Sequence, residues 1–177
     1  MNISGISKNN LNFESLKIKI KGKNFDNHPK DADRIRDAIN NNENIMNFYK
    51  DRDGKILVKS KNVKIPVAYD YPDFMRNPDI SDSAPDQFVL ECTKPVIDIK
   101  CTYKRKFAMK NLFKKPVSVI TGTRADKSTT WKSCMDGALE CIKLLGKDSP
   151  EDMKKRGDSI QRDLYSVEAR RLKIEEA

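Results

Sequence analysis

Lysines and apolar residues alternate along one stretch of the chain, and in a second stretch two lysines flank an apolar run; this spacing limits the fold more than any other feature. Residues 16–21 read Leu-Lys-Ile-Lys-Ile-Lys, and residues 55–59 read Lys-Ile-Leu-Val-Lys. Because successive side chains of a strand point to opposite faces, the pattern predicts strands with one apolar face and one lysine-bearing face. The apolar face needs a second layer to cover it, so we expect a sheet with one wet side.

The other apolar patterns predict an α+β fold. Strands are predicted at 55–59 and 63–67, joined as a hairpin, and at 88–92, 96–103 and 117–120, with Lys94-Pro95 as a break. Helices are predicted at 31–49, 104–115, 127–145 and from Pro150 onward, with Ser149 as a cap, Gly146 as a stop, and the run Asn40-Asn41-Asn42 splitting the first. We expect a mainly antiparallel sheet with helices on one side and a C-terminal helical hairpin.

Length and composition favour one domain with polar ends. The chain has 177 residues, so residues 14–177 are expected to form a single α+β domain after a flexible tail at 1–13. Residues 69–87 hold three prolines and five aspartates, which predicts a long acidic loop. No run of 18 apolar residues and no secretory signal peptide occurs. We expect a protein that is not transmembrane and is cytoplasmic or exported without a Sec signal, even into a host cell.

Cysteine and histidine usage predicts neither a metal site nor a cofactor. The four cysteines have no CxxC spacing, and His28 is the one histidine. The cysteines are expected to be small buried side chains in a reducing cytosol. His28 precedes Pro29, a pattern typical of a loop that enters a helix. Without an HExxH, GxSxG or GxGxxG motif, we favour a protein that is not an enzyme.

Positive charge is concentrated in one stretch. Residues 100–132 hold ten basic residues and one acid, so their balance equals the net charge of +9 of the whole chain. The candidate surface for an anionic partner consists of Lys104, Arg105, Lys106, Lys110, Lys114 and Lys115. Nucleic acid, an anionic membrane and an acidic protein each fit such a surface, and so does a merely solvated face. The excess of lysine over arginine favours non-specific attraction.

Residues 117–130 run from an apolar strand through Gly122 to Lys127-Ser128 and a helix. This order resembles the P-loop of nucleotide triphosphatases, whose backbone amides, lysine and hydroxyl hold phosphates and magnesium. The second glycine of that motif is missing and the loop is one residue short, which puts the phosphate cradle in doubt. A simpler anion site would use Arg124, Lys127 and Ser128 with free helix amides. The remaining alternative is a plain helix start capped by a hydroxyl side chain.

Two further segments are candidate docking elements. Tyr69, Tyr71 and Phe74 lie among acids and prolines, as in a linear docking motif; the same loop could cover the basic residues or tuck its aromatics into the domain. Residues 153–174 carry a broken heptad seam of apolar positions. The seam predicts a helix–helix contact within the chain or a site for a partner helix.

Three functions follow from these patterns. The first is a non-enzymatic binding or adaptor protein that engages an anionic partner through residues 104–115. The second is a secreted bacterial virulence effector that binds a host protein or membrane, suggested by the polar start of the chain. The third is a small phosphate-handling enzyme with a degenerate P-loop-like turn at 122–129.

Overall fold

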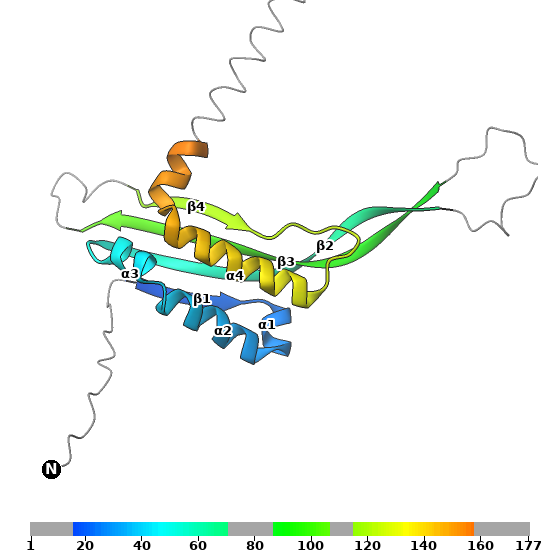
Figure 1. Cartoon of the computed structure of the whole chain (residues 1–177), viewed down its shortest axis with the longest axis horizontal. Coiled ribbons are helices and arrows are strands. Elements are labelled where there is room, and N and C mark those ends of the chain that lie inside the picture. The colour runs from blue at the N-terminus through cyan, green and yellow to red at the C-terminus, as the bar shows by residue number, and fades with distance from the viewer. Residues whose placement is uncertain (1–15, 71–86, 107–114, 158–177) are drawn as a thin grey trace, which may run out of the picture.

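The computed structural model describes residues 16–70, 87–106 and 115–157. Within these ranges, helices cover one face of a single β-sheet (Figure 1). The strands are β1 (Leu16–Lys21), β2 (Arg52–Asp70), β3 (Gln87–Arg105) and β4 (Val117–Gly122). The helices are α1 (Lys23–Asn27), α2 (Pro29–Asn40), α3 (Glu43–Tyr49) and α4 (Trp131–Lys147), followed by helical residues 150–157. The predicted α+β class is confirmed.

Several predicted segments lie outside the described residues. They are the tail at 1–13, residues 71–86 of the acidic loop predicted at 69–87, residues 107–114 of the helix predicted at 104–115, and the chain from 158 onward. The C-terminal helical hairpin and most of the seam at 153–174 belong to the chain from 158 onward, so both stay predictions. The predicted ends of the loop and of the basic helix are wrong, because β2 reaches Asp70 and β3 spans Gln87–Arg105.

The sheet is mixed, which corrects the expectation of a mainly antiparallel one. Its order is β1-β2-β3-β4; β1 and β2 are parallel, and the two other neighbouring pairs are antiparallel. Parallel neighbours need a crossover connection, and α1, α2 and α3 supply it between β1 and β2. The alternation in residues 16–21 predicts a strand but carries no sign of its direction.

β2 and β3 are continuous long strands, which corrects two predicted interruptions. β2 passes through residues 60–62 without turning, because β3 continues to pair with it, so the hairpin at 55–67 is wrong. β3 likewise runs through Pro95, which lies opposite Asn62. Pairing of β3 with β4 starts only at Asp98, so Pro95 lies where β3 is an edge strand and a missing N–H is tolerated. Beyond the sheet the two strands project as a ribbon (Figure 1).

The core lies between the sheet and the helices. Ile97, Ile99, Cys101 and Tyr103 are all buried, as expected for residues that share one face of a strand. They belong to one cluster with buried residues of every helix from α1 to α4, which include Phe25, Ile35, Ile39, Ile45, Tyr49, Met135, Ala138 and Ile142. Each large aliphatic side chain buried there contributes about 1.5–3 kcal/mol. This cluster leaves the opposite face of the sheet for other uses.

α1 forms just before His28, where the sequence indicates a loop that enters a helix. Gly22 precedes it with a φ of 120°, a conformation that glycine adopts without strain. Phe25 is 3% exposed and packs edge-to-face on Trp131, with ring centroids 5.3 Å apart. Tertiary packing of this one aromatic therefore produces a short helix that local propensity does not predict.

Side chains set the ends of the next helices. The predicted helix at 31–49 is split into α2 and α3, as the asparagine run indicated, because Asn42 caps α3 by accepting the Ile45 N–H at 3.2 Å. Asn42 also donates to the Ile142 carbonyl at 3.3 Å, which links α3 to α4. The predicted stop at Gly146 is wrong, since α4 continues to Lys147 and the glycine leaves room for the Asn42 side chain.

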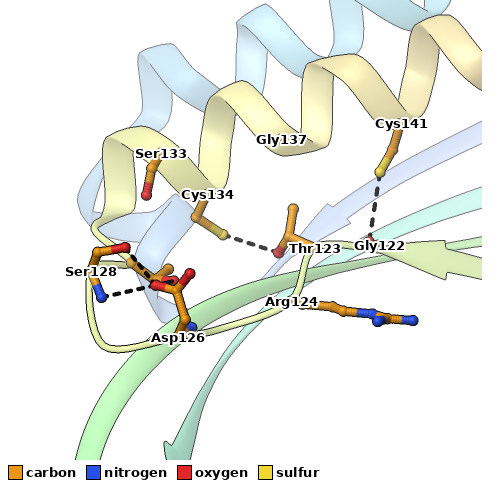
Figure 2. Close-up of a pocket in the computed structure, with 10 residues that line it drawn as sticks. Gly122, Thr123, Arg124, Asp126, Ser128, Ser133, Cys134, Gly137 and Cys141 are labelled. Atoms are coloured by element: carbon orange, nitrogen blue, oxygen red, sulfur yellow. Dashed lines mark hydrogen bonds between the residues drawn. The ribbon is translucent and has the colours of Figure 1, made fainter.

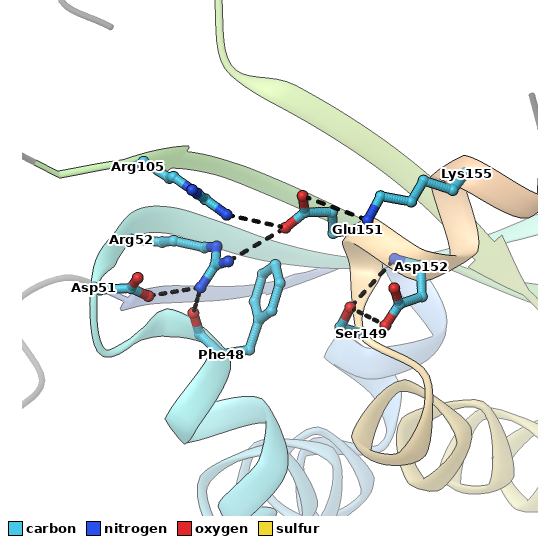
Figure 3. Close-up of polar contacts among 8 residues, drawn as sticks. All are labelled: Phe48, Asp51, Arg52, Arg105, Ser149, Glu151, Asp152 and Lys155. Carbon is cyan, nitrogen blue, oxygen red and sulfur yellow. Dashed lines mark hydrogen bonds and ion pairs between the residues drawn. The ribbon is translucent and has the colours of Figure 1, made fainter. Parts of the chain in front are cut away.

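Residues 150–157 are tied to one end of the sheet (Figure 3). As predicted, Ser149 caps this helix, and its hydroxyl accepts an N–H of the first turn at 3.2 Å. Glu151 accepts a hydrogen bond from the Arg52 guanidinium at 3.2 Å and lies 3.9 Å from Arg105. The ion pairs join the start of β2 and the end of β3 to the helix, so they serve the fold.

Candidate functional site

Lysines gather on the face of the sheet that faces away from the helices. Ile56 and Val58 of β2 are buried against the helices, so Lys55 and Lys59 point to the opposite side. The same alternation orients the side chains of β1 and β3. Lys61 and Lys104 also lie on this side, but Lys61 is paired with Asp98, and Lys104 lies opposite Asp53. The other lysines of this side are called the lysine face: Lys17, Lys19, Lys21, Lys55, Lys59 and Lys100.

Two pairs of these lysines lie directly opposite each other on β1 and β2. Lys17 is the register partner of Lys55, and Lys21 is the register partner of Lys59. Neighbouring strands are about 4.8 Å apart, so each pair of ammonium groups repels. Like charges opposite each other destabilise a sheet by about 0.2–1 kcal/mol per pair. A fold that keeps two such pairs gives up stability, which is typical of a functional surface.

The middle row of the face crosses all four strands. Lys19 lies opposite Leu57, Leu57 opposite Lys100, and Lys100 opposite Ile120 of β4. Ile120 is 66% exposed, whereas Leu57 is half-buried between the two lysines. β4 contains no charged residue. The positive charge is therefore concentrated over β1, β2 and the centre of β3.

Acidic side chains of the described chain do not neutralise the lysine face. Two aspartates share the open side: Asp98 lies opposite Lys59 in the register of β2 and β3 but forms its ion pair with Lys61, at 2.7 Å, and Asp53 lies 3.7 Å from Lys106. Among the residues that the structure describes, none of the six lysines forms an ion pair. Six positive charges thus face solvent without a carboxylate partner in this part of the chain.

The basic surface predicted from residues 104–115 is placed in part. Lys104 and Arg105 end β3, Lys106 follows, Lys115 is exposed before β4, and Lys110 and Lys114 lie outside the described residues. Arg105 lies 3.9 Å from Glu151 and Lys106 lies 3.7 Å from Asp53, so acids of the same chain engage both. Lys104 shares the face of β3 that carries Lys100. Anion binding by this surface stays a prediction.

The turn before α4 is held together by a carboxylate (Figure 2). Asp126 accepts the Ser128 hydroxyl at 2.7 Å, the Ser128 N–H at 2.8 Å and the Thr129 hydroxyl at 3.0 Å. The hydrogen bond from the Ser128 side chain is the largest cause that holds the pKa of Asp126 below its ordinary value, and the hydrogen bond from Thr129 is the next. Asp126 therefore occupies the N–H and hydroxyl of Ser128, the groups that would face the bound nucleotide in a P-loop. Thr130 caps α4 in a capping box with Ser133, so a hydroxyl side chain starts this helix as predicted, at Thr130 rather than at Ser128 or Thr129.

A cavity of about 350 Å³ opens between this turn and α4. Arg124 and Ser128 line the cavity and Lys127 does not. Figure 2 shows Arg124 directed along the sheet, away from Ser128. The structure thus brings two of the three predicted anion-site residues to one cavity without turning them toward a common point. Anion binding there stays a prediction.

The cysteines are placed as packing residues. Cys101 and Cys134 are buried, as predicted, whereas Cys92 and Cys141 are half-buried. Burial raises the pKa of the Cys101 thiol to about 11 and also raises the pKa of the Cys134 thiol. Both thiols are therefore protonated at neutral pH. In the described ranges, no group of three or more His, Cys, Asp or Glu side chains is arranged to hold a metal ion.

The two candidate docking elements are described only at their margins. Tyr69, near the end of β2, is 41% exposed and stacks on Phe88 with ring centroids 5.6 Å apart. Tyr71 and Phe74 lie outside the described residues. At the start of the predicted seam, Met153 packs against the main core. This contact agrees with a helix that docks within its own chain, and the partner-helix alternative stays a prediction.

The lysine spacing at residues 16–21 and 55–59 predicted the wet faces of β1 and β2 but did not join them into one surface. What it lacked was the pairing of β1 beside β2, which sets Lys17 and Lys21 against other lysines. Charge counted along the chain favoured residues 100–132, whereas folding gathers lysines from three strands.

Among the described residues, helices long and apolar enough to cross a membrane are absent.

No family model matches the chain, and no curated protein or solved structure matches it. The six charges of the lysine face are gathered by strand pairing, and none of them forms an ion pair with a described residue.

Proposed function

We propose that the protein is a non-enzymatic binding or adaptor protein whose lysine face engages an anionic partner. One observation carries the proposal. The six lysines of the lysine face come from three strands, and none of them forms an ion pair with a carboxylate among the described residues. The proposed binding surface is therefore assembled from β1, β2 and β3 by strand pairing, whereas the sequence alone favoured the continuous segment 104–115.

The six charges act together because they lie close to one another. Alternate residues of a strand are about 6.6 Å apart and neighbouring strands about 4.8 Å apart. Both spacings are shorter than the Debye length of about 8 Å at physiological ionic strength. The fields of the lysines therefore add, and an extended anionic surface is attracted by all of them. Such a partner also relieves the repulsion within the Lys17–Lys55 and Lys21–Lys59 pairs.

An acidic protein, an anionic membrane and a nucleic acid all carry the charge that this face attracts. A secreted bacterial effector would use the same face on a host partner, and the polar start that suggests export lies outside the described residues. Contacts in the described chain support neither export nor phosphate handling.

Heparin affinity chromatography tests the proposal. The Lys19→Gln/Lys59→Gln variant is expected to elute at clearly lower salt than the wild type, because two of six cationic contacts are lost. The matched control is Lys30→Gln/Lys132→Gln, which removes the same charge from exposed lysines of α2 and α4. This control is expected to elute with the wild type. Equal elution of both variants would show that the lysine face is not the binding surface.

A further inference from the structure

We propose that the anionic partner is the phosphate backbone of a nucleic-acid duplex, bound without regard to base sequence; this inference rests on the proposed function. The lysine face contains no arginine. Arginine reads guanine edges through its two-pronged guanidinium, whereas lysine offers a compact point charge that suits a phosphate. Contacts to phosphates fix a protein on nucleic acid but carry no sequence information. The side chains available therefore fit the backbone.

The lysines form a patch with two dimensions, which favours a duplex over a single strand. Lys17, Lys19 and Lys21 extend over about 13 Å of β1, given about 3.3 Å per residue. Lys55 and Lys59 of β2 lie about 5 Å to the side, and the single Lys100 of β3 lies about 10 Å away. A single strand offers one line of phosphates. A duplex offers two lines, separated by a groove about 6 Å or 12 Å wide, so lysines spread over three strands can reach both lines.

The open side also lacks the groups that single-stranded nucleic acid needs. Proteins that bind single strands stack bases on aromatic rings, at about 1–3 kcal/mol per base. Among the described residues of β1 to β4, Tyr103 is buried on the helix side, and Tyr69 and Phe88 lie on the projecting ribbon. None of these rings lies among the six lysines. Backbone attraction without base stacking points to a duplex.

A membrane is the closest rival, and the face fits it less well. Stable membrane attachment needs a second signal beside a basic patch, such as a lipid chain or an inserted apolar group. Leu57 is half-buried between Lys19 and Lys100, and Ile120 is the one large apolar side chain exposed on the described open side of the sheet proper. One such side chain supplies about 2 kcal/mol when fully buried. The basic half of the face therefore offers little to insert.

Fluorescence anisotropy tests the inference. The wild type is titrated against two unrelated 20-base-pair DNA duplexes, the matching single strands, and vesicles with and without phosphatidylserine. We expect similar affinity for both duplexes and weaker binding to single strands. The logarithm of the duplex binding constant should fall with the logarithm of the salt concentration with a slope of about 5.4, as six phosphate contacts require. In Lys19→Gln/Lys59→Gln the slope should fall to about 3.6, with roughly 60-fold weaker binding near 0.1 M salt.

The control and rival outcomes separate the two proposals. Lys30→Gln/Lys132→Gln should bind duplexes like the wild type, and Ile120→Ser should leave duplex binding unchanged. The protein could instead bind phosphatidylserine vesicles more tightly than duplexes, with Ile120→Ser weakening the vesicle binding. That result would refute a duplex as the partner but would leave the lysine face as an anion-binding surface. Single-strand binding at least equal to duplex binding would also overturn the inference. Retention on heparin that no lysine-face variant alters would overturn the proposed function itself.

Discussion

Replacing Gly54 with alanine is expected to lower the free energy of unfolding by about 3 kcal/mol. The melting temperature should fall by roughly 6–12 °C, as this loss implies for a domain of this size. Gly54 lies in β2 between Leu16 of β1 and Tyr103 of β3. An added Cβ would collide with the Tyr49 ring and with the carbonyl oxygen of Thr102. Tyr49 is 1% exposed, so its ring has no space into which it can move.

The matched control for this substitution is Gly157→Ala. Gly157 is exposed in the helical residues 150–157, and an added Cβ there meets no atom within 4 Å. The control is expected to be neutral or to stabilise by up to about 1 kcal/mol, because alanine favours a helix over glycine. Urea unfolding followed by circular dichroism measures both variants. A Gly54→Ala protein as stable as the wild type would show that Tyr49 does not pack beneath β2 at this point.

The Lys17→Glu/Lys21→Glu variant is expected to be more stable than the wild type and to bind anions poorly. The changes place carboxylates opposite Lys55 and Lys59, so two repulsive pairs become attractive. We expect a gain of about 1 kcal/mol at low ionic strength. This gain should fade near 1 M salt, where the Debye length is about 3 Å. Heparin affinity should fall at least about tenfold, since two cationic contacts become repulsive.

Opposite changes in stability and affinity are what distinguish a functional surface from a merely solvated one. If the lysines only kept the protein in solution, the variant would gain stability and its heparin binding would be set by net charge alone. The test is therefore made beside Lys30→Glu/Lys132→Glu, which has the same net charge. Equal loss of heparin affinity in both variants would contradict a role for the lysine face.

Strand faces were predictable because their signal is local. Alternation over six residues predicts β1 and the sides that Leu16 and Lys17 occupy. The buried face of β3 from Ile97 to Tyr103 followed from the same rule, and it is confirmed. The asparagine run indicated the break between α2 and α3, which Asn42 stabilises as a cap. Each of these features depends on side chains a few residues apart.

Features that depend on distant partners were not predictable. The turn-like residues 60–62 stay extended because β3 pairs with them, and no local pattern contains that information. α1 exists because Phe25 reaches Trp131, more than one hundred residues away in the chain. The lysine face has the same origin, since Lys17 and Lys55 meet only through the parallel register. Local charge density instead drew attention to residues 100–132.

Lysine acetylation footprinting with and without heparin tests the central claim most directly. A water-soluble acetylating reagent modifies exposed lysines, and mass spectrometry reads each site. Heparin is expected to protect the six residues of the lysine face, while Lys30 and Lys132 of the helix side are modified equally in both conditions. Protection confined to the segment 104–115 or to the helix side, with Lys19 and Lys59 modified as in the free protein, would contradict binding at the lysine face.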